Sequence, residues 1–342
     1  MATNTLSSRG NLFDVLKFKR PDAKGAISVA NTLIETLHFM EDMPSVPANG
    51  NTWHQGLRVQ SLPSGSMVDI GGTWGASKTE RTPFVECLAT IRDSYESPLD
   101  VLKTEGPEIS KALVADEKIN HIEGNGQAWS NLLLNGPSTP TQNSIVGLMD
   151  RAPWATYDNE FCYNVGGTGN DLRSAWLIQP SITTVHLLHN PNHPTLGVEM
   201  EDKTGPNGIY KVDPDDSTKH NYWAVIEFML QQGLCIRDQR AVKRLANIPC
   251  AITDYSGPDV IMYAITASLK HNTLANRPWF MYCDGDLYAQ LVNGTNQKLK
   301  VYTSNKNIYQ TELPMIGSNI IIRRWDSLNH ASGSGETVVA SA

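Results

Sequence analysis

A long apolar stripe between residues 107 and 134 constrains the fold most strongly. Small or apolar side chains recur there at spacings of 3, 4, 3, 4, 3 and 4, namely Ala112, Ala115, Ile119, Ile122, Gly126, Trp129 and Leu133. Pro107 suits the first turn of a helix, and the dipeptide Gly136-Pro137 suits its end. We therefore expect one long helix with a narrow apolar face.

The segments on either side of residue 60 predict a short helix and a hairpin. Residues 28–41 have an apolar face of Val29, Leu33, Ile34 and Leu37, which predicts a helix capped by Ser28. Two alternating runs within 53–75 flank a turn at 63–66 and predict a β-hairpin. This hairpin is polar and has little core of its own, so it needs a partner, for which another subunit is a candidate. Residues 84–103 predict a further helix, with Pro98 as a candidate break.

From residue 150 onward the pattern predicts mainly strands. They are expected at 174–179, 183–189, 209–212, 223–230, 279–283 and 319–325, with one helix at 258–271. The small, polar tail after Asn329 is expected to be loose. A long helix followed by a sheet-rich lobe is typical of the α+β class.

The composition describes a chain of 342 residues that buries a sizeable core in one elaborated domain or two. Charged residues make up 18%, which is below the roughly 25% of an average soluble protein and fits a subunit that buries surface against copies of itself. The net charge of -7 argues against a dedicated nucleic-acid binder. By contrast, the first thirty residues carry a net +3 and predict a basic arm or a solvated tail.

The cysteines and the N-terminus indicate a chain made in a reducing cytoplasm. The five cysteines are odd in number and widely spaced, with no CxxC motif. The N-terminus has no apolar signal core, and no apolar run approaches the roughly 18 residues of a membrane span. We expect a soluble protein that has no membrane partner.

No motif for catalysis, for a cofactor or for a metal rises above background. The glycine-rich loop 166–171 lacks the spacing of a phosphate-binding loop, and His186 and His189 point to opposite faces of their strand. Sequence spacing does not exclude a catalytic triad, because triads assemble in space. A basic cluster at Arg237, Arg240, Lys243 and Arg244 predicts ion pairs between subunits, with plain solvation as the alternative.

The order of segments resembles a known family. After the helix that contains "ETL" come "GNTWHQGLRVQSLP", "GASKTERTPFVECLATIRDSYESPLDVLK", "ADEKINHIEGNGQAWSNLLLNG", "VGLMDRAP", "GGTGNDLRSAWLIQ", "EFMLQQGLCIRDQRAVKRLANI" and "MIGSNIIIRRWDSLNHASGSGETVV". This series, from about residue 31 to 339, resembles the major capsid proteins (major head proteins) of tailed bacteriophages, especially the short-tailed type.

The resemblance implies the Hong Kong 97 (HK97)-like phage capsid fold. Its parts would be an N-terminal arm and short helix at 1–48, an extended E-loop hairpin at 49–83, and a peripheral domain with the long spine helix at 84–150. An axial domain of mixed sheet and helices would follow at 151–315. Residues 316–342 would form a strand that returns to the peripheral domain and a C-terminal tail.

The family also implies a function and partners. The protein would self-assemble as hexamers and pentamers into the icosahedral head that encloses the double-stranded DNA genome, without enzymatic activity and without a cofactor. Partners would be itself, a scaffolding protein, the portal protein, a cement or decoration protein in some members, and DNA bound non-specifically. It would lie in the virion, and in the host cytoplasm during assembly.

Five residues are candidates for contacts between subunits, since aromatic residues and arginine often dominate interfaces. They are Trp53, Arg58 and Trp74 in the expected E-loop, with Arg237 and Arg240. The alternatives to a phage head are an encapsulin-like cargo nanocompartment, another virion component such as a tail or decoration protein, and an enzyme such as a hydrolase. An enzyme would require a pocket with convergent titratable groups.

Overall fold

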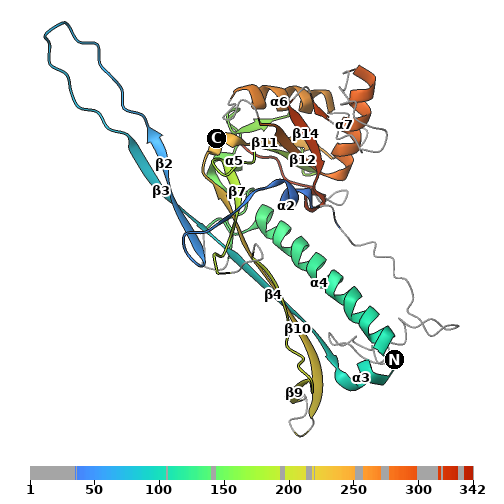
Figure 1. Cartoon of the computed structure of the whole chain (residues 1–342). Helices are drawn as coiled ribbons and strands as arrows, with labels where there is room; N and C mark the ends of the chain where they lie inside the picture. Colours follow the sequence, from blue (N-terminus) through green and yellow to red (C-terminus); the bar gives the residue numbers. More distant parts are fainter. Residues whose placement is uncertain are drawn as a thin grey trace, which may run out of the picture. The chain divides into compact units, whose positions relative to one another are not determined.

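The computed structural model describes residues 35, 37–104, 107–139, 144–192, 197–212, 218, 220–250, 257–270, 277–298, 315–316, 319–329 and 335–341 (Figure 1). The chain divides into two compact units. Unit 1 covers the described parts of Met1–Glu35, Thr90–Trp129 and His193–Gln231. Unit 2 covers those of Thr36–Ala89, Ser130–Asn192 and Gln232–Ala342. These units follow a different division of the chain from the expected domains, because His193–Gln231 clusters with the long helix.

Unit 1 combines the long helix with a narrow sheet. Helix α4 spans Pro107–Asn135 and follows the short helix α3, Leu99–Thr104. Strand β10, His220–Ile236, pairs with β4 (Ala89–Pro98), β8 (Val198–Asp202) and β9 (Ile209–Val212). Tyr95, Ile226 and Phe228 form a small core against Val114 of α4. His121 of α4 stacks on Phe228 with ring centroids 5.0 Å apart.

The expected long helix is confirmed, but its stripe does not face the sheet. Ile119 and Ile122 are 59% and 50% exposed, and Ala115 is also exposed. The stripe is buried only at its far end, at Trp129 and Leu133. Val114 and His121, which are not part of the stripe, contact the sheet instead. Val114 packs against the small core of Tyr95, Ile226 and Phe228, and the His121 ring stacks on Phe228.

Two expectations for the first hundred residues are wrong. Strand β2, Trp53–Ser61, pairs with β3 at Glu80–Cys87, and the segment 62–79 joins them, so the expected turn at 63–66 is not a tight turn. The expected helix 84–103 consists of β3, β4 and α3. Phe84, Leu88 and Ile91 have helical spacing, but Phe84 lies in β3, which pairs with β2, and Ile91 lies in β4, which pairs with β10. Of the expected helix 28–41, α2 covers only His38–Asp42, and residues 28–34 lie outside the described residues.

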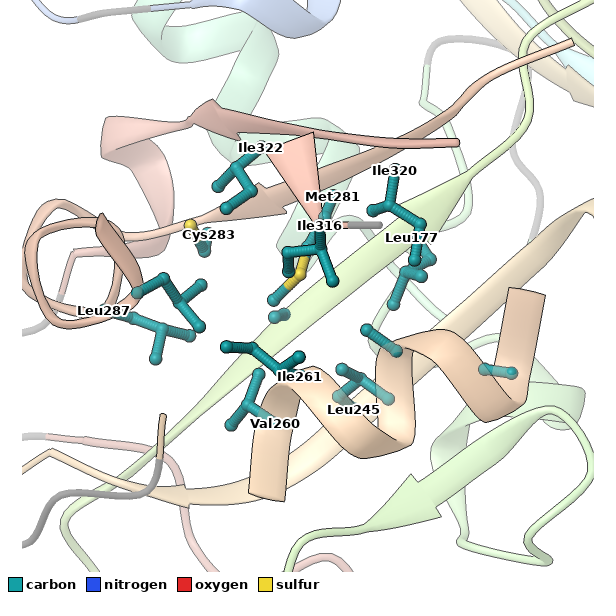
Figure 2. Packing of buried hydrophobic residues seen from close by; sticks show 14 of the residues in the cluster. Leu177, Leu245, Val260, Ile261, Met281, Cys283, Leu287, Ile316, Ile320 and Ile322 are labelled. Carbon is teal, nitrogen blue, oxygen red and sulfur yellow. The ribbon is translucent and has the colours of Figure 1, made fainter. Parts of the chain in front are cut away.

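Unit 2 is built on a six-stranded sheet in the order β13-β14-β12-β6-β11-β5. These strands are Met315–Ile316, Ile320–Arg324, Trp279–Cys283, Leu172–Ile178, Val242–Pro249 and Cys162–Asn164. Helices α6 (Gly257–Lys270) and α7 (Gly285–Lys298) lie beside it. Figure 2 shows the core between them, where Leu177 and Met281 of the sheet meet Ile261 of α6 and Leu287 of α7. All residues of β6 are buried, which is typical of a strand covered on both faces.

The opposite face of this sheet carries an aromatic cluster. Phe39 of α2 stacks on Trp325 at 4.8 Å and tilts against Tyr282 at 5.2 Å. Trp325 Nε1 donates to Ser130 Oγ at 2.6 Å, and Asp42 pairs with Arg323 at 2.6 Å.

The remaining elements of unit 2 are short. Strand β1 (Ser45–Pro47) runs parallel to β7 (Val185–His189), and helix α5 spans Ala152–Ala155. The short helices η1 and η2 cover Gln239–Ala241 and Asp326–Leu328.

The C-terminal part of the chain differs from the expectation. Strand β14 pairs in parallel with β12, and its Ile320 and Ile322 are buried in the sheet core, so this strand stays in the sheet of β12 and β6. The tail was expected to be loose, yet residues 335–341 are held by Leu172, Asn247 and Arg244. Glu336 pairs with Arg244 at 2.7 Å, which supplies the charge partner of a buried guanidinium.

A candidate assembly surface on the hairpin

The hairpin of β2 and β3 has two chemically different faces. The strands are antiparallel, with Trp53 opposite Cys87, Leu57 opposite Pro83 and Val59 opposite Arg81, and the register shifts between Val59 and Ser61. Because directly opposite residues of an antiparallel pair point to the same side, alternate pairs form an inner and an outer face. His54, Gly56, Arg58, Phe84 and Glu86 belong to the inner face.

The inner face is packed against the rest of unit 2. A Cβ atom at Gly56 would lie 2.4 Å from the Phe84 ring, so the glycine lets the ring cross the partner strand. The Arg58 guanidinium lies 4.2 Å from the centre of the same ring and donates to the carbonyl oxygen of Ile236. Burial lowers the pKa of Arg58, although a guanidinium with so high an ordinary pKa stays charged.

A buried ion pair fixes the base of the hairpin. Glu86 accepts two hydrogen bonds from Arg151, at 2.8 and 3.0 Å, and lies 3.6 Å from Arg58. Glu86 and Arg151 are 5% and 9% exposed. This two-point geometry fixes the direction of both side chains. It ties β3 to the segment that follows the end of α4.

The outer face is apolar and open to solvent. Leu57 is 62% exposed, and Trp53, Val59 and Val85 on the same face are also exposed. The segment 62–79 continues from the ends of the strand pair in Figure 1 and exposes Leu62, Met67, Ile70 and Trp74, the last at 80%. Contiguous apolar side chains on a surface mark a place where another molecule binds. We call this outer face together with 62–79 the hairpin surface.

Of the five expected contact residues, four are exposed and one is used within its own chain. Trp53 and Trp74 belong to the hairpin surface, and Arg237 and Arg240 are exposed just after β10. Arg240 is held by Asp238 at 2.9 Å. Arg58 instead uses its guanidinium within its own chain, on the carbonyl of Ile236, the residue before Arg237. The expected basic cluster is not one surface, because Lys243 and Arg244 are buried.

Two histidines lie edge to face at the hairpin base. The ring centroids of His54 and His186 are 6.4 Å apart. Burial, with the nearby charges of His54 and Arg237, lowers the pKa of His186 to about 4. Burial and Arg237 lower the pKa of His54 as well. Both rings are therefore neutral near pH 7.

Sequence reasoning missed Phe84, Glu86 and Arg151. The first two were assigned to a helix, where they would not share a face with β2. The run of Thr82, Phe84 and Val85 has the residue types that strands favour, and this was the available signal. Arg151 is 65 positions from Glu86, and nothing local connects them.

The described residues contain side chains of the types that bind metal ions, including all five cysteines. Among them, no group of three or more His, Cys, Asp or Glu side chains is placed to hold a metal ion. The five cysteines are free, and burial raises the pKa of the Cys235 thiol to about 12. Within the described part of the chain, no helix has both the length and the apolar character to cross a membrane.

Comparison with known protein families gives one assignment. The family model "Major capsid protein GP7" matches residues 21–334. No curated protein matches the sequence.

Comparison with solved structures gives a likeness over the whole chain. The structure of bacteriophage Epsilon15 matches with a TM-score of 0.72 and 18% identity, covering 100% of both chains. The capsid of bacteriophage JBD30 matches with a TM-score of 0.49 and 7% identity over 88% of this chain and 92% of that one. The SrpI encapsulin of Synechococcus elongatus PCC 7942 has a TM-score of 0.42 and 9% identity, over 65% and 93%. The Epsilon15 match confirms the expected α+β fold of the HK97-like capsid type.

Proposed function

The chain belongs to the GP7 family of major capsid proteins, and we propose that it builds the icosahedral phage head from hexamers and pentamers around the double-stranded DNA genome. Self-association into a shell and a place in the virion follow from the family. The observation that supports the ring geometry is the hairpin surface, whose apolar side chains are exposed among the residues that the structure describes.

Rings of identical subunits require two different surfaces on each subunit, one that meets the next copy and one that meets the previous copy. The hairpin surface is our candidate for the first. Its inner face is fixed by Arg58, Phe84 and the Glu86–Arg151 pair, so its outer face is presented in a defined direction. The open segment 62–79 adds contact area that neither copy gains alone.

We assign the E-loop to the hairpin of β2 and β3 with the segment 62–79. The peripheral domain then corresponds to unit 1 with α4 as its spine helix, and the axial domain to the six-stranded sheet of unit 2 with α6 and α7. This assignment moves His193–Gln231 out of the axial domain expected at 151–315 and adds β14, which was expected to return to the peripheral domain.

The remaining proposed partners are those implied by the assembly of a phage head and the packaging of its DNA. We propose a scaffolding protein during assembly in the host cytoplasm, a portal protein at one vertex, and non-specific contact with packaged DNA. A cement or decoration protein is a further candidate partner. The role proposed for this chain is structural rather than enzymatic.

Single substitutions on the hairpin surface test the ring contact. Leu57→Asp and Trp74→Asp place a charge where an apolar contact is proposed, while Ser66→Asp adds the same charge at a polar, exposed position of the segment 62–79. Losing about 2 kcal/mol of apolar burial at every contact lowers particle yield by about tenfold or more. We expect Ser66→Asp to assemble normally.

The readout is particle yield by sedimentation and negative-stain microscopy, with circular dichroism to verify that each variant is folded. If folded Leu57→Asp and Trp74→Asp gave wild-type particle yields, the hairpin surface would not be part of the ring contact. Loss of assembly in Ser66→Asp as well would show that added charge, rather than lost apolar contact, is responsible.

A further inference from the structure

Helix α4 has an exposed apolar stripe outside the face that packs on its sheet. Ala115, Ile119 and Ile122 stand at positions i, i+4 and i+7 and are exposed. At 100° per residue, the centre of this stripe lies about 120° around the helix from His121, which stacks on Phe228. The stripe therefore has no function in the packing of α4 on the sheet of unit 1.

Glu35, the first residue that the structure describes, lies beside this stripe. The backbone amide of Glu35 donates to Glu123 Oε1 at 3.0 Å. Glu123 follows Ile122 directly, and both partners of this hydrogen bond belong to unit 1. Whatever precedes Glu35 in the chain therefore starts within about one helical turn of Ile122 and Ile119.

The sequence before Glu35 has a matching apolar face. Residues 28–34, SVANTLI, lie outside the described residues, and their pattern of Val29, Leu33 and Ile34 predicts an amphipathic helix. We propose that this face docks on the stripe of Ala115, Ile119 and Ile122 in the same chain. The N-terminal arm is thereby fastened to its own long helix before it extends further.

The lengths agree with docking within one chain. Seven helical residues span about 10 Å, which is also the length of the stripe from Ala115 to Ile122. No additional connection is needed, because Glu35 is already fixed at one end of the stripe. The inference does not depend on shell formation.

A disulfide between two introduced cysteines tests the contact. Leu33→Cys with Ile119→Cys places thiols on the two proposed faces, and Leu33→Cys with Lys103→Cys is the matched control on α3. We expect rapid oxidation of the first pair within one chain, at least tenfold faster than the control pair, as measured by peptide mass mapping. Mapping also separates the new bond from the five native free cysteines.

The outcomes are distinct. A disulfide between residues 33 and 119 of one chain, seen in subunits and in particles, supports the proposal. Cross-linked dimers or ladders would show that a neighbour's arm covers the stripe and would overturn it. Oxidation no faster than in the control pair would overturn it as well.

Accessibility provides a second readout that needs no disulfide. The thiol of Ile119→Cys is expected to react with maleimide at least tenfold faster when Leu33→Asp and Ile34→Asp disrupt the docking face. An unchanged rate in the folded variant would contradict the proposal. Particle formation is scored separately by microscopy, so failure of this contact is distinguishable from failure of assembly.

Discussion

Removing the Glu86 carboxylate is expected to destabilise unit 2 more than any surface ion pair does. Glu86→Ala leaves the Arg151 guanidinium, which is 9% exposed, without the carboxylate that accepts its two hydrogen bonds. Breaking a buried pair by removing one partner costs about 3–5 kcal/mol, because the remaining charge stays buried and uncompensated. The expected loss in unfolding free energy is therefore about 3–5 kcal/mol.

The structure offers a matched control for this variant. Arg240→Ala breaks its pair with Asp238 but keeps the cap that Asp238 makes, and such a pair, with the Arg240 side chain 59% exposed, contributes about 0–1 kcal/mol. Urea unfolding of unassembled subunits, followed by tryptophan fluorescence, measures both losses. The double variant Glu86→Leu/Arg151→Met is expected to regain most of the stability, because apolar side chains of similar volume replace a buried pair at little cost.

An equal, small loss in Glu86→Ala and Arg240→Ala would refute the reasoning, since it would mean that Arg151 finds water or another partner. A double variant as unstable as Glu86→Ala would show that packing, rather than uncompensated charge, explains the loss.

Three further outcomes are expected. The pKa of His186 is lowered to about 4 in the folded chain, below its unfolded value, so the unfolded chain binds more protons between these two pKa values. The unfolding free energy is therefore expected to fall by up to about 3 kcal/mol as the pH drops from about 6.5 to 4. Urea titrations at several pH values should show a flatter pH dependence in His186→Gln. Gly124→Ala should raise the unfolding free energy by about 0.5–1 kcal/mol, because the added Cβ meets open space. Gly136→Ala should lower the unfolding free energy, because its Cβ would lie 2.2 Å from a carbonyl oxygen. A gain in stability at both positions would contradict this. Glu336→Ala should leave the buried Arg244 without its carboxylate partner, cost about 3 kcal/mol and speed carboxypeptidase digestion of the tail; an unchanged digestion rate would show that the tail is held by its backbone alone.

Local signals predicted the elements that local chemistry determines. Helix α4 was expected at 107–134 and spans Pro107–Asn135, because the proline and Gly136-Pro137 mark its ends directly. Strands β9 and β12 have the bounds that the sequence predicted for them. The fold type followed from the order of segments and is confirmed by the likeness to the Epsilon15 structure.

Where the sequence-based predictions of secondary structure were wrong, contacts with residues distant in the sequence determined the structure. The segment from Phe84 to Ile91 has helical spacing, but β2 and β10 supply strand partners for its backbone. The tail looked loose because its partners, Arg244 and Asn247, are about ninety residues away. Periodicity also located the apolar stripe of α4 correctly without showing which side the sheet would cover.

For the candidate contacts, residue type predicted exposure at Trp53 and Trp74 but not at Arg58. The guanidinium of Arg58 fits the Phe84 ring and the Ile236 carbonyl, and both contacts exist only once the hairpin has folded onto unit 2. Whether Trp53, Trp74, Arg237 and Arg240 contact a neighbouring subunit stays a prediction.

Cryo-electron microscopy of the expressed protein, alone and with its neighbouring open reading frames, tests the central claim most directly. The account predicts closed shells, or rings of five and six subunits, in which the hairpin surface of each copy is covered by the next copy. A monodisperse monomer under all conditions would contradict it, as would shells in which Leu57 and Trp74 remain exposed to solvent.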